Sequence, residues 1–137
     1  MTFDPEVRDH LVQAAIQARR WAYAPYSKYA VGAALLTASG KIYEGVNIEN
    51  AAYPHTICAE RTAVFKAVSE GERQFTAIAV VTSNAGMPCG ACRQALSEFC
   101  APGMPVYYAG AGSSIVETTI GELLPADSLH DLKDAGA

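Results

Sequence analysis

Three cysteines and a glutamate in this chain have the residue types and the spacing of a zinc site that carries out chemistry. Cys58 lies two residues before Glu60, and Cys89 and Cys92 follow in the run Pro-Cys-Gly-Ala-Cys. Three thiolates can hold one Zn²⁺ and leave its fourth position open, which distinguishes a catalytic zinc from a structural one. Zinc lowers the pKa of a water at that position to about 7, and Glu60 is then free to move protons beside the metal.

The spacing predicts that the three thiols lie at the starts of two helices. Cys89 and Cys92 are three residues apart, so a helix places both on one face, and Pro88 suits the start of that helix. Cys58 opens a second predicted helix. The free N–H groups and the macrodipole of a helix N-terminus favour thiolate over thiol, so the two starts together would favour a bound dication. The alternative is a buried cysteine pair without a metal.

The role of Glu60 depends on where Cys58 stands in its helix. Cys58 and Glu60 are two residues apart, so on a regular helix their side chains would point to different sides. Both can serve one site if Cys58 is the cap residue, where the backbone is not yet helical. A structural zinc would instead take Glu60 as its fourth ligand. Because three thiolates on Zn²⁺ leave a net negative charge, a positive group should stand close, and Arg61 and Arg93 are the candidates. An ordinary surface position is the alternative for each arginine, and Cys100 is expected to be a core residue.

Turn residues and apolar periodicity divide the chain into alternating helices and strands. The predicted order is helix 5–21, strands 31–37 and 41–46, loop 47–56, helix 58–69, strand 76–81, loop 83–88, helix 89–99, strands 106–108 and 115–118, and a short helix or turn pair at 121–132. Because helices cross over between strands, we expect a mixed, largely parallel sheet of five strands with helices on both faces, a three-layer α/β/α fold. Residues 1–137 are expected to form a single domain.

Composition and charge narrow the class of protein. Half of the 137 residues are hydrophobic and 18% are charged, which is typical of a folded domain with a sizeable core. The formal net charge of −4 argues against nucleic acid as a partner, because a phosphate backbone attracts a positive surface. No signal-peptide pattern and no run of about 20 apolar residues stands out, so we expect a cytoplasmic protein that does not enter a membrane. In the cytoplasm, paired cysteines indicate metal binding or catalysis more often than disulfides.

Five segments together resemble the small homotetrameric cytidine deaminases. The resemblance runs from about residue 24 to residue 125, and the order ligand-x-Glu followed by Pro-Cys-x-x-Cys is typical of zinc deaminases of nucleobases. The segments that carry it are Ala-Pro-Tyr-Ser-Lys-Tyr at 24–29, Val-Gly-Ala-Ala at 31–34, Gly-Val-Asn-Ile-Glu-Asn-Ala at 45–51, Cys-Ala-Glu-Arg-Thr-Ala at 58–63 and Pro-Cys-Gly-Ala-Cys-Arg-Gln at 88–94.

The resemblance implies a role for each site residue. One zinc per chain would be held by Cys58, Cys89 and Cys92, Glu60 would be the catalytic proton shuttle, and Arg61 would donate hydrogen bonds to the ligand sulfurs. The remaining implied residues are those that contact substrate: Asn47 and Glu49 on the ribose 3′-hydroxyl, Tyr29 beside the base, Asn50 and Ala59 along the same site, and Ala51 and Tyr53 serving a neighbouring subunit's site. Independently, Asn47 and Glu49 would face the same way on an extended segment; a pair that caps a loop is the alternative.

Two positions depart from the family pattern. The family usually has Phe where this chain has Tyr29, which adds a hydroxyl beside the base. A short run containing Phe usually follows the equivalent of Pro125, and residues 126–129 read Ala-Asp-Ser-Leu, without an aromatic. A stacking contact on a neighbour's substrate is therefore in question.

The function implied is zinc-dependent hydrolytic deamination of cytidine and deoxycytidine to uridine and deoxyuridine, with release of ammonia, in pyrimidine salvage. One alternative is a deaminase of another cytosine-containing compound, such as blasticidin S. The other is a non-catalytic protein stabilised by a structural zinc. A homotetramer with shared active sites is implied, and Gly32, Ala33 and Ala34 would permit close packing between subunits, although a tight core within one chain would use them equally well.

Overall fold

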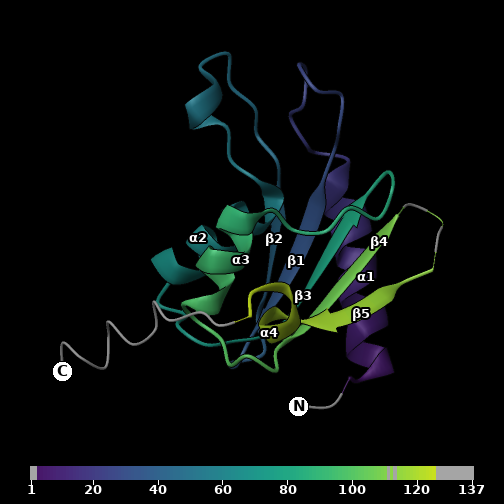
Figure 1. The fold of residues 1–137 in the computed structure, drawn as a ribbon, viewed down its shortest axis with the longest axis vertical. Helices are drawn as coiled ribbons and strands as arrows, with labels where there is room; N and C mark the ends of the chain where they lie inside the picture. The colour runs from purple at the N-terminus through teal and green to yellow at the C-terminus, as the bar shows by residue number, and fades with distance from the viewer. Residues whose placement is uncertain (1–2, 111, 113, 126–137) are drawn as a thin grey trace.

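A five-stranded sheet forms the centre of the protein (Figure 1). The computed structural model describes residues 3–110, 112 and 114–125. The strands lie in the order β2-β1-β3-β4-β5. Their bounds are β1 Gly32–Thr37, β2 Ile42–Val46, β3 Phe75–Thr82, β4 Pro105–Gly110 and β5 Val116–Thr119.

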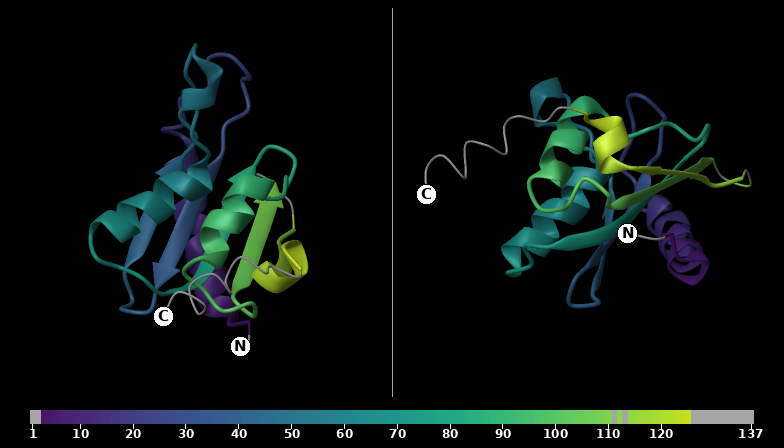
Figure 2. Two further views of the ribbon diagram at one scale, coloured as in Figure 1. Left: turned by 60° about the vertical axis from the view of Figure 1, so that its left-hand side comes forward. Right: turned by 60° about the horizontal axis from the view of Figure 1, so that its bottom comes forward.

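Helices cover the sheet on both faces, so the predicted three-layer α/β/α arrangement is confirmed. Helix α1 (Pro5–Arg19) packs on one face, whereas α2 (Ala59–Ser69) and α3 (Gly90–Ser97) pack on the other (Figure 2). The short α4 (Ile120–Leu123) lies on the side of α2 and α3, and a single 3₁₀ turn, η1, spans Tyr53–His55. Within the described ranges, no helix is long and apolar enough to cross a membrane.

The sheet is mixed, as predicted, but the expectation that it is largely parallel is wrong. Only the pairing of β3 with β4 is parallel, and the other three pairings are antiparallel. The two helix crossovers do make β2, β3 and β4 run in the same direction. However, β1 lies between β2 and β3 and runs against both, so the first crossover joins strands that are not neighbours.

Two apolar clusters hold the layers together, one on each face of the sheet. Strand β3 contributes to both clusters and is therefore buried on both faces. On the α1 face, Leu11 and Ala15 of the helix are almost fully buried against the strands. On the other face the cluster comprises Leu35, Tyr43, Ala63, Val64, Ala67, Phe75, Ile78, Val80, Leu96, Met104, Val106 and Ile120.

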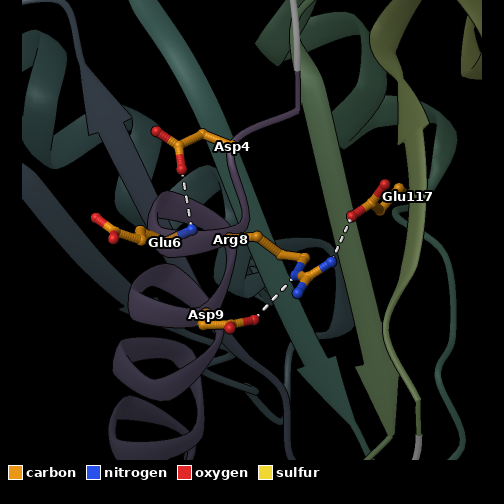
Figure 3. Close-up of polar contacts among 5 residues, drawn as sticks. All are labelled: Asp4, Glu6, Arg8, Asp9 and Glu117. Carbon is orange, nitrogen blue, oxygen red and sulfur yellow. Dashed lines mark hydrogen bonds and ion pairs between the residues drawn. The ribbon is translucent and has the colours of Figure 1, made fainter.

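The start of α1 is fixed to the far edge of the sheet (Figure 3). Asp4 caps the helix by accepting a hydrogen bond from the backbone N–H of Glu6 at 2.9 Å, and Pro5 occupies the first helical position. One turn later, Arg8 donates to Asp9 and to Glu117 of β5, each at 2.9 Å. The pair with Glu117 therefore links the first helix to the last strand, although an exposed ion pair of this kind stabilises a fold by only about 0–1 kcal/mol.

Two strand glycines allow helices to approach the sheet closely. A Cβ on Gly32 would lie 2.1 Å from the carbonyl oxygen of Ala15 in α1. A Cβ on Gly45 of β2 would lie 2.3 Å from the carbonyl oxygen of Ala59 at the start of α2. Gly32 and the fully buried Ala33 and Ala34 are thus used within this chain's own core. Their small size therefore gives no support for contacts between subunits.

The helix bounds differ modestly from those predicted. Helix α1 ends at Arg19 rather than residue 21, and α3 ends at Ser97 rather than residue 99. Helix α4 covers only Ile120–Leu123 of the segment predicted at 121–132, and residues 126–132 lie outside the described part of the chain. The missing aromatic expected after Pro125 falls in that same part.

Candidate functional site

The starts of α2 and α3 meet at one end of the sheet. Because β2 and β3 run in the same direction, the loops that follow these two strands leave the sheet at the same end. Each loop ends in a cysteine at the N-cap of the next helix, with extended backbone angles: φ −78° and ψ 155° for Cys58, and φ −69° and ψ 167° for Cys89. Neither side chain caps its own helix by a hydrogen bond, so both sulfurs remain available to another partner.

The three sulfurs are close enough to share one metal ion. Cys58 Sγ lies 3.7 Å from Cys89 Sγ, and Cys89 Sγ lies 3.2 Å from Cys92 Sγ. All three lie within 4.8 Å of one another. Sulfurs at about 2.3 Å from one tetrahedral zinc are about 3.8 Å apart, so the cluster fits a Zn²⁺ with three thiolate ligands. In the described ranges, these three residues form the group with metal-ligand geometry.

Electrostatic contacts within this cluster favour negative charge on Cys58. The hydrogen bond from Cys92, together with the Arg61 guanidinium, lowers the pKa of Cys58 to about 5, although partial burial opposes the shift. The same sulfur–sulfur contact raises the pKa of Cys92. Arg61 Nη2 donates to Cys58 Sγ at 3.4 Å, so this arginine stands where the sequence called for a positive group. Arg93 does not: it donates to the carbonyl oxygens of Pro88 and Leu123.

Glu60 lies in the first turn of α2, beside the cysteines and against a cavity. Its side chain is almost fully buried, with 4% of the residue exposed. Burial, with a smaller contribution from the charge of Cys58, raises the pKa of this carboxyl to about 7. A carboxyl group that gains and loses a proton near neutral pH is suited to general acid–base catalysis. With Cys58 at the cap position, Glu60 lines the same cavity as Cys58 and Cys89.

The cavity has a volume of about 290 Å³ and opens at the same end of the sheet. Asn50 and Ala51 are exposed and lie outside its lining, and Cys92 is buried behind it. The lining residues predicted from the sequence are Tyr29, Asn47, Glu49, Tyr53, Cys58, Ala59, Glu60 and Cys89.

Asn47 and Glu49 already hold one wall of this cavity. Asn47 accepts a hydrogen bond from the backbone N–H of Val31 at 2.9 Å and donates to the carbonyl oxygen of Tyr29 at 2.7 Å. Glu49 accepts from the backbone N–H groups of Tyr26 and Ser27, at 3.0 and 3.1 Å, and from the Ser27 hydroxyl. These bonds lower the pKa of Glu49. The loop-capping alternative is therefore realised, and because a carboxylate has about four lone-pair sites, Glu49 can accept a further hydrogen bond from a ligand.

The opposite wall was missed from the sequence. Thr82, Gly86 and Met87 line the cavity, in the segment that runs from the end of β3 to the ligand Cys89. Their residue types carry no chemical signal. Their position does, because a loop that leads directly into a metal ligand must pass beside the metal.

Comparisons with known proteins agree with this geometry. The sequence model of the family described as the cytidine and deoxycytidylate deaminase zinc-binding region matches residues 5–108. A protein named cytidine deaminase from Sporosarcina psychrophila is 55% identical over 93% of this chain and 96% of its own length. Another from Halalkalibacterium halodurans is 52% identical over 93% of this chain and 98% of its own length. The crystal structure of cytidine deaminase from Burkholderia pseudomallei superposes with a TM-score of 0.83 at 45% identity, and covers 92% of this chain and 98% of that one.

Proposed function

We propose a substrate range and residue roles for a chain that belongs to the cytidine and deoxycytidylate deaminase family. The chain is a zinc-dependent enzyme that hydrolyses cytidine to uridine and ammonia. The observation that carries the proposal is the juxtaposition of three clustered thiols and a buried glutamate beside a cavity of about 290 Å³.

Cys58, Cys89 and Cys92 would hold one zinc per chain. Their donor set and spacing fit a site with three protein ligands and one open position. Zinc bound there supplies a Lewis acid that makes a water deprotonate near neutral pH. Arg61 balances the negative charge of the thiolates through its hydrogen bond to Cys58.

Glu60 would carry the protons of the reaction. Deamination replaces the C4 amino group of the base by an oxygen that comes from water. A carboxylate is needed to accept a proton from the water, and a carboxylic acid is needed to deliver protons to ring N3 and to the leaving amine. With its pKa near 7, Glu60 is suited to alternate between the two forms. Its burial keeps bulk water away from that exchange.

The cavity walls would bind the nucleoside. We assign the base to the space beside Tyr29 and Ala59, and the ribose 3′-hydroxyl to Asn47 and Glu49. The two polar side chains would then have two tasks, since they also hold the loop that carries Tyr29. If the pair binds the 3′-hydroxyl, no side chain is assigned to the 2′ position, so deoxycytidine would also be accepted, with deoxyuridine as its product.

Asn50, Ala51 and Tyr53 would act at the boundary between subunits of a homotetramer. Support comes from the two loops that project beyond the end of the sheet (Figure 1). Both loops expose large apolar side chains, and a large exposed apolar surface is typical of an interaction site. The large apolar side chains exposed on these loops are Trp21, Tyr23, Tyr26, Ile48 and Tyr53, of which Tyr53 is the most exposed at 83%.

The remaining roles are proposed on chemical grounds. A small nucleoside substrate and a net charge of −4 suit a metabolic enzyme that binds neither nucleic acid nor membrane. Four cysteines, none in a disulfide among the described residues, suit the reducing cytoplasm. Pyrimidine salvage is the process that such an activity would serve.

The experiment that tests the function compares nucleosides that differ in the sugar. The kcat/KM of the zinc-loaded protein would be measured for cytidine, deoxycytidine, 2′,3′-dideoxycytidine and cytosine. We expect similar values for the first two and large losses for the others, because a polar pair built around a hydroxyl is left without its partner. Equal turnover of cytosine or dideoxycytidine would instead favour a deaminase of another cytosine-containing compound. No ammonia from any of the four would favour a structural zinc.

A further inference from the structure

A hydrogen bond between two loops ties the two walls of the cavity together. The phenol oxygen of Tyr29 lies 2.7 Å from Oδ1 of Asn84, a residue 55 positions later in the chain. We propose that Tyr29 is a positioning residue that, through Asn84, holds the segment from Thr82 to Met87 against the bound base. This inference rests on the proposed use of the cavity for cytidine.

The contact continues into the core at the end of β3. Thr82, which is 3% exposed, donates from its hydroxyl to Oδ1 of Asn84 at 3.3 Å. The same hydroxyl accepts the backbone N–H of Gly86 at 2.8 Å. The Asn84 oxygen therefore joins the Tyr29 hydroxyl to a buried anchor, and the anchor fixes the backbone of the residue that lines the cavity.

Tyr29 is itself held firmly at its backbone. Its carbonyl oxygen accepts from Asn47 Nδ2 at 2.7 Å, and its N–H donates to the Ser27 hydroxyl oxygen at 3.0 Å. Ser27 in turn is bonded to Glu49. The Tyr29 hydroxyl thus extends from a fixed wall toward the other one, so the bond to Asn84 positions the second wall relative to the first.

The backbone on both sides of this bond has an unusual conformation. Lys28, directly before Tyr29, has φ 61°, and Ala85, directly after Asn84, has φ 58°. Residues with a Cβ rarely adopt this left-handed region unless their surroundings hold them there. Both positions are next to the residues that form the bond, which is consistent with a contact that keeps two tight turns in place.

Gly86 fits only because it lacks a side chain. A Cβ at this position would lie 2.5 Å from the Tyr29 phenol oxygen, whereas the next nearest atom, Asn84 Oδ1, would be 3.4 Å away. The obstacle is therefore the hydroxyl oxygen alone. If Tyr29 were Phe, an alanine at Gly86 would meet only ordinary contacts.

Loss of the bond between Tyr29 and Asn84 should weaken substrate binding more than it slows the chemical step. Gly86 and Met87 line the cavity just before Cys89, whereas Cys92 is buried within α3 and Cys58 and Glu60 lie at the start of α2. If the hydroxyl is lost, the wall loosens but the proton shuttle and the zinc stay in place. We therefore expect a rise in KM at nearly constant kcat.

The test measures zinc content, KM and kcat for Tyr29→Phe, Asn84→Ala, the double variant, and Asn84→Asp. One net hydrogen bond corresponds to a rise in KM of about 3- to 10-fold, and we expect it in each of the first two variants with zinc retained. The double variant should be no worse than Asn84→Ala, because Asn84→Ala already lacks the bond that Tyr29→Phe removes. Asn84→Asp keeps an acceptor oxygen, so its KM should be closer to that of the wild type than the KM of Asn84→Ala is. An unchanged KM in Tyr29→Phe, additive losses, or loss of zinc would overturn the proposal.

A second test needs no turnover. Gly86→Ala should lower the thermal midpoint of unfolding in the wild-type background and should be tolerated in the Tyr29→Phe background. Equal destabilisation in both would show that the hydroxyl does not set the position of Gly86. If wild-type protein fails to deaminate cytidine, the proposed function is wrong, but this stability comparison still decides whether the two walls are coupled.

Discussion

Arg61 donates a hydrogen bond from Nη2 to the sulfur of Cys58 at 3.4 Å, one turn further along the same helix. The spacing of three residues brings the guanidinium back over the N-cap, so α2 supplies both a ligand and the charge that balances it. A second guanidinium nitrogen, Nε, is buried without a hydrogen-bond partner among the described residues.

Replacing Arg61 by Met should make zinc easier to displace by protons. After the larger contribution of Cys92, the Arg61 charge lowers the pKa of Cys58, so its loss raises that pKa and protons compete at higher pH. We expect the midpoint of acid-induced zinc release to move up by about 1 pH unit. A colorimetric zinc indicator in an acid titration measures it. Arg61→Lys, which keeps the charge, should shift less, and coincident curves for Met and wild type would contradict the assignment.

Replacing Glu60 by Gln should remove turnover but not zinc. Glutamine has nearly the same shape but cannot carry protons, and general acid–base catalysis contributes about 10²- to 10⁴-fold. Assays of ammonia release and elemental analysis on one preparation give both results. Zinc lost together with activity would identify Glu60 as a ligand and would favour a structural site.

Replacing Cys89 by Ala should remove zinc, whereas Cys100→Ala should not. Cys89 Sγ lies within 3.7 Å of both other sulfurs of the cluster. Cys100 is packed against the apolar cluster under α2 and α3, and burial raises the pKa of its thiol to about 12. The two variants delete the same chemical group, so the zinc content per chain compares them directly. Equal retention would remove the basis for the three-thiolate site.

Glu49→Gln should lower the thermal midpoint of unfolding, mainly above about pH 5. The bonds from Ser27 and Tyr26 hold the pKa of Glu49 below its ordinary value of 4.5. A lowered carboxyl pKa stabilises the folded state above the unfolded-state pKa, and this contribution disappears as the pH falls through the folded-state value. The thermal midpoints of wild type and Glu49→Gln, both in chelator, should therefore differ at pH 7 and converge as the pH falls below 4.5. A constant difference would mean that the carboxylate charge is not involved.

Local features were predictable from the sequence and long-range pairings were not. The cluster of Cys58, Cys89 and Cys92 follows from helix starts and a spacing of three residues, which depend on neighbours in the chain. The insertion of β1 between β2 and β3 depends on strand pairing across 30 or more residues, as in Gly32 with Val81, and periodicity does not encode it.

The cavity walls show a second limit. A carboxylate beside an amide suits a sugar hydroxyl and a loop equally, so Asn47 and Glu49 could not be assigned to one task by residue type. The bond from Tyr29 to Asn84 spans 55 residues and joins two loops. From the sequence, the Tyr29 hydroxyl stood out only as a departure from a family pattern, and its partner carried no signal.

The close approach of α2 to Gly45 has an evolutionary consequence. A single added carbon there would collide with the first residue of the helix, Ala59, and with Ala63 one turn on, and would push the N-cap cysteine away from its partners. Gly45 lies outside the cavity lining, yet a side chain there would displace the N-cap residue Cys58. A residue larger than glycine fits at position 45 only if α2 moves away from the strand. Substitutions at positions 45, 59 and 63 should therefore occur together or not at all.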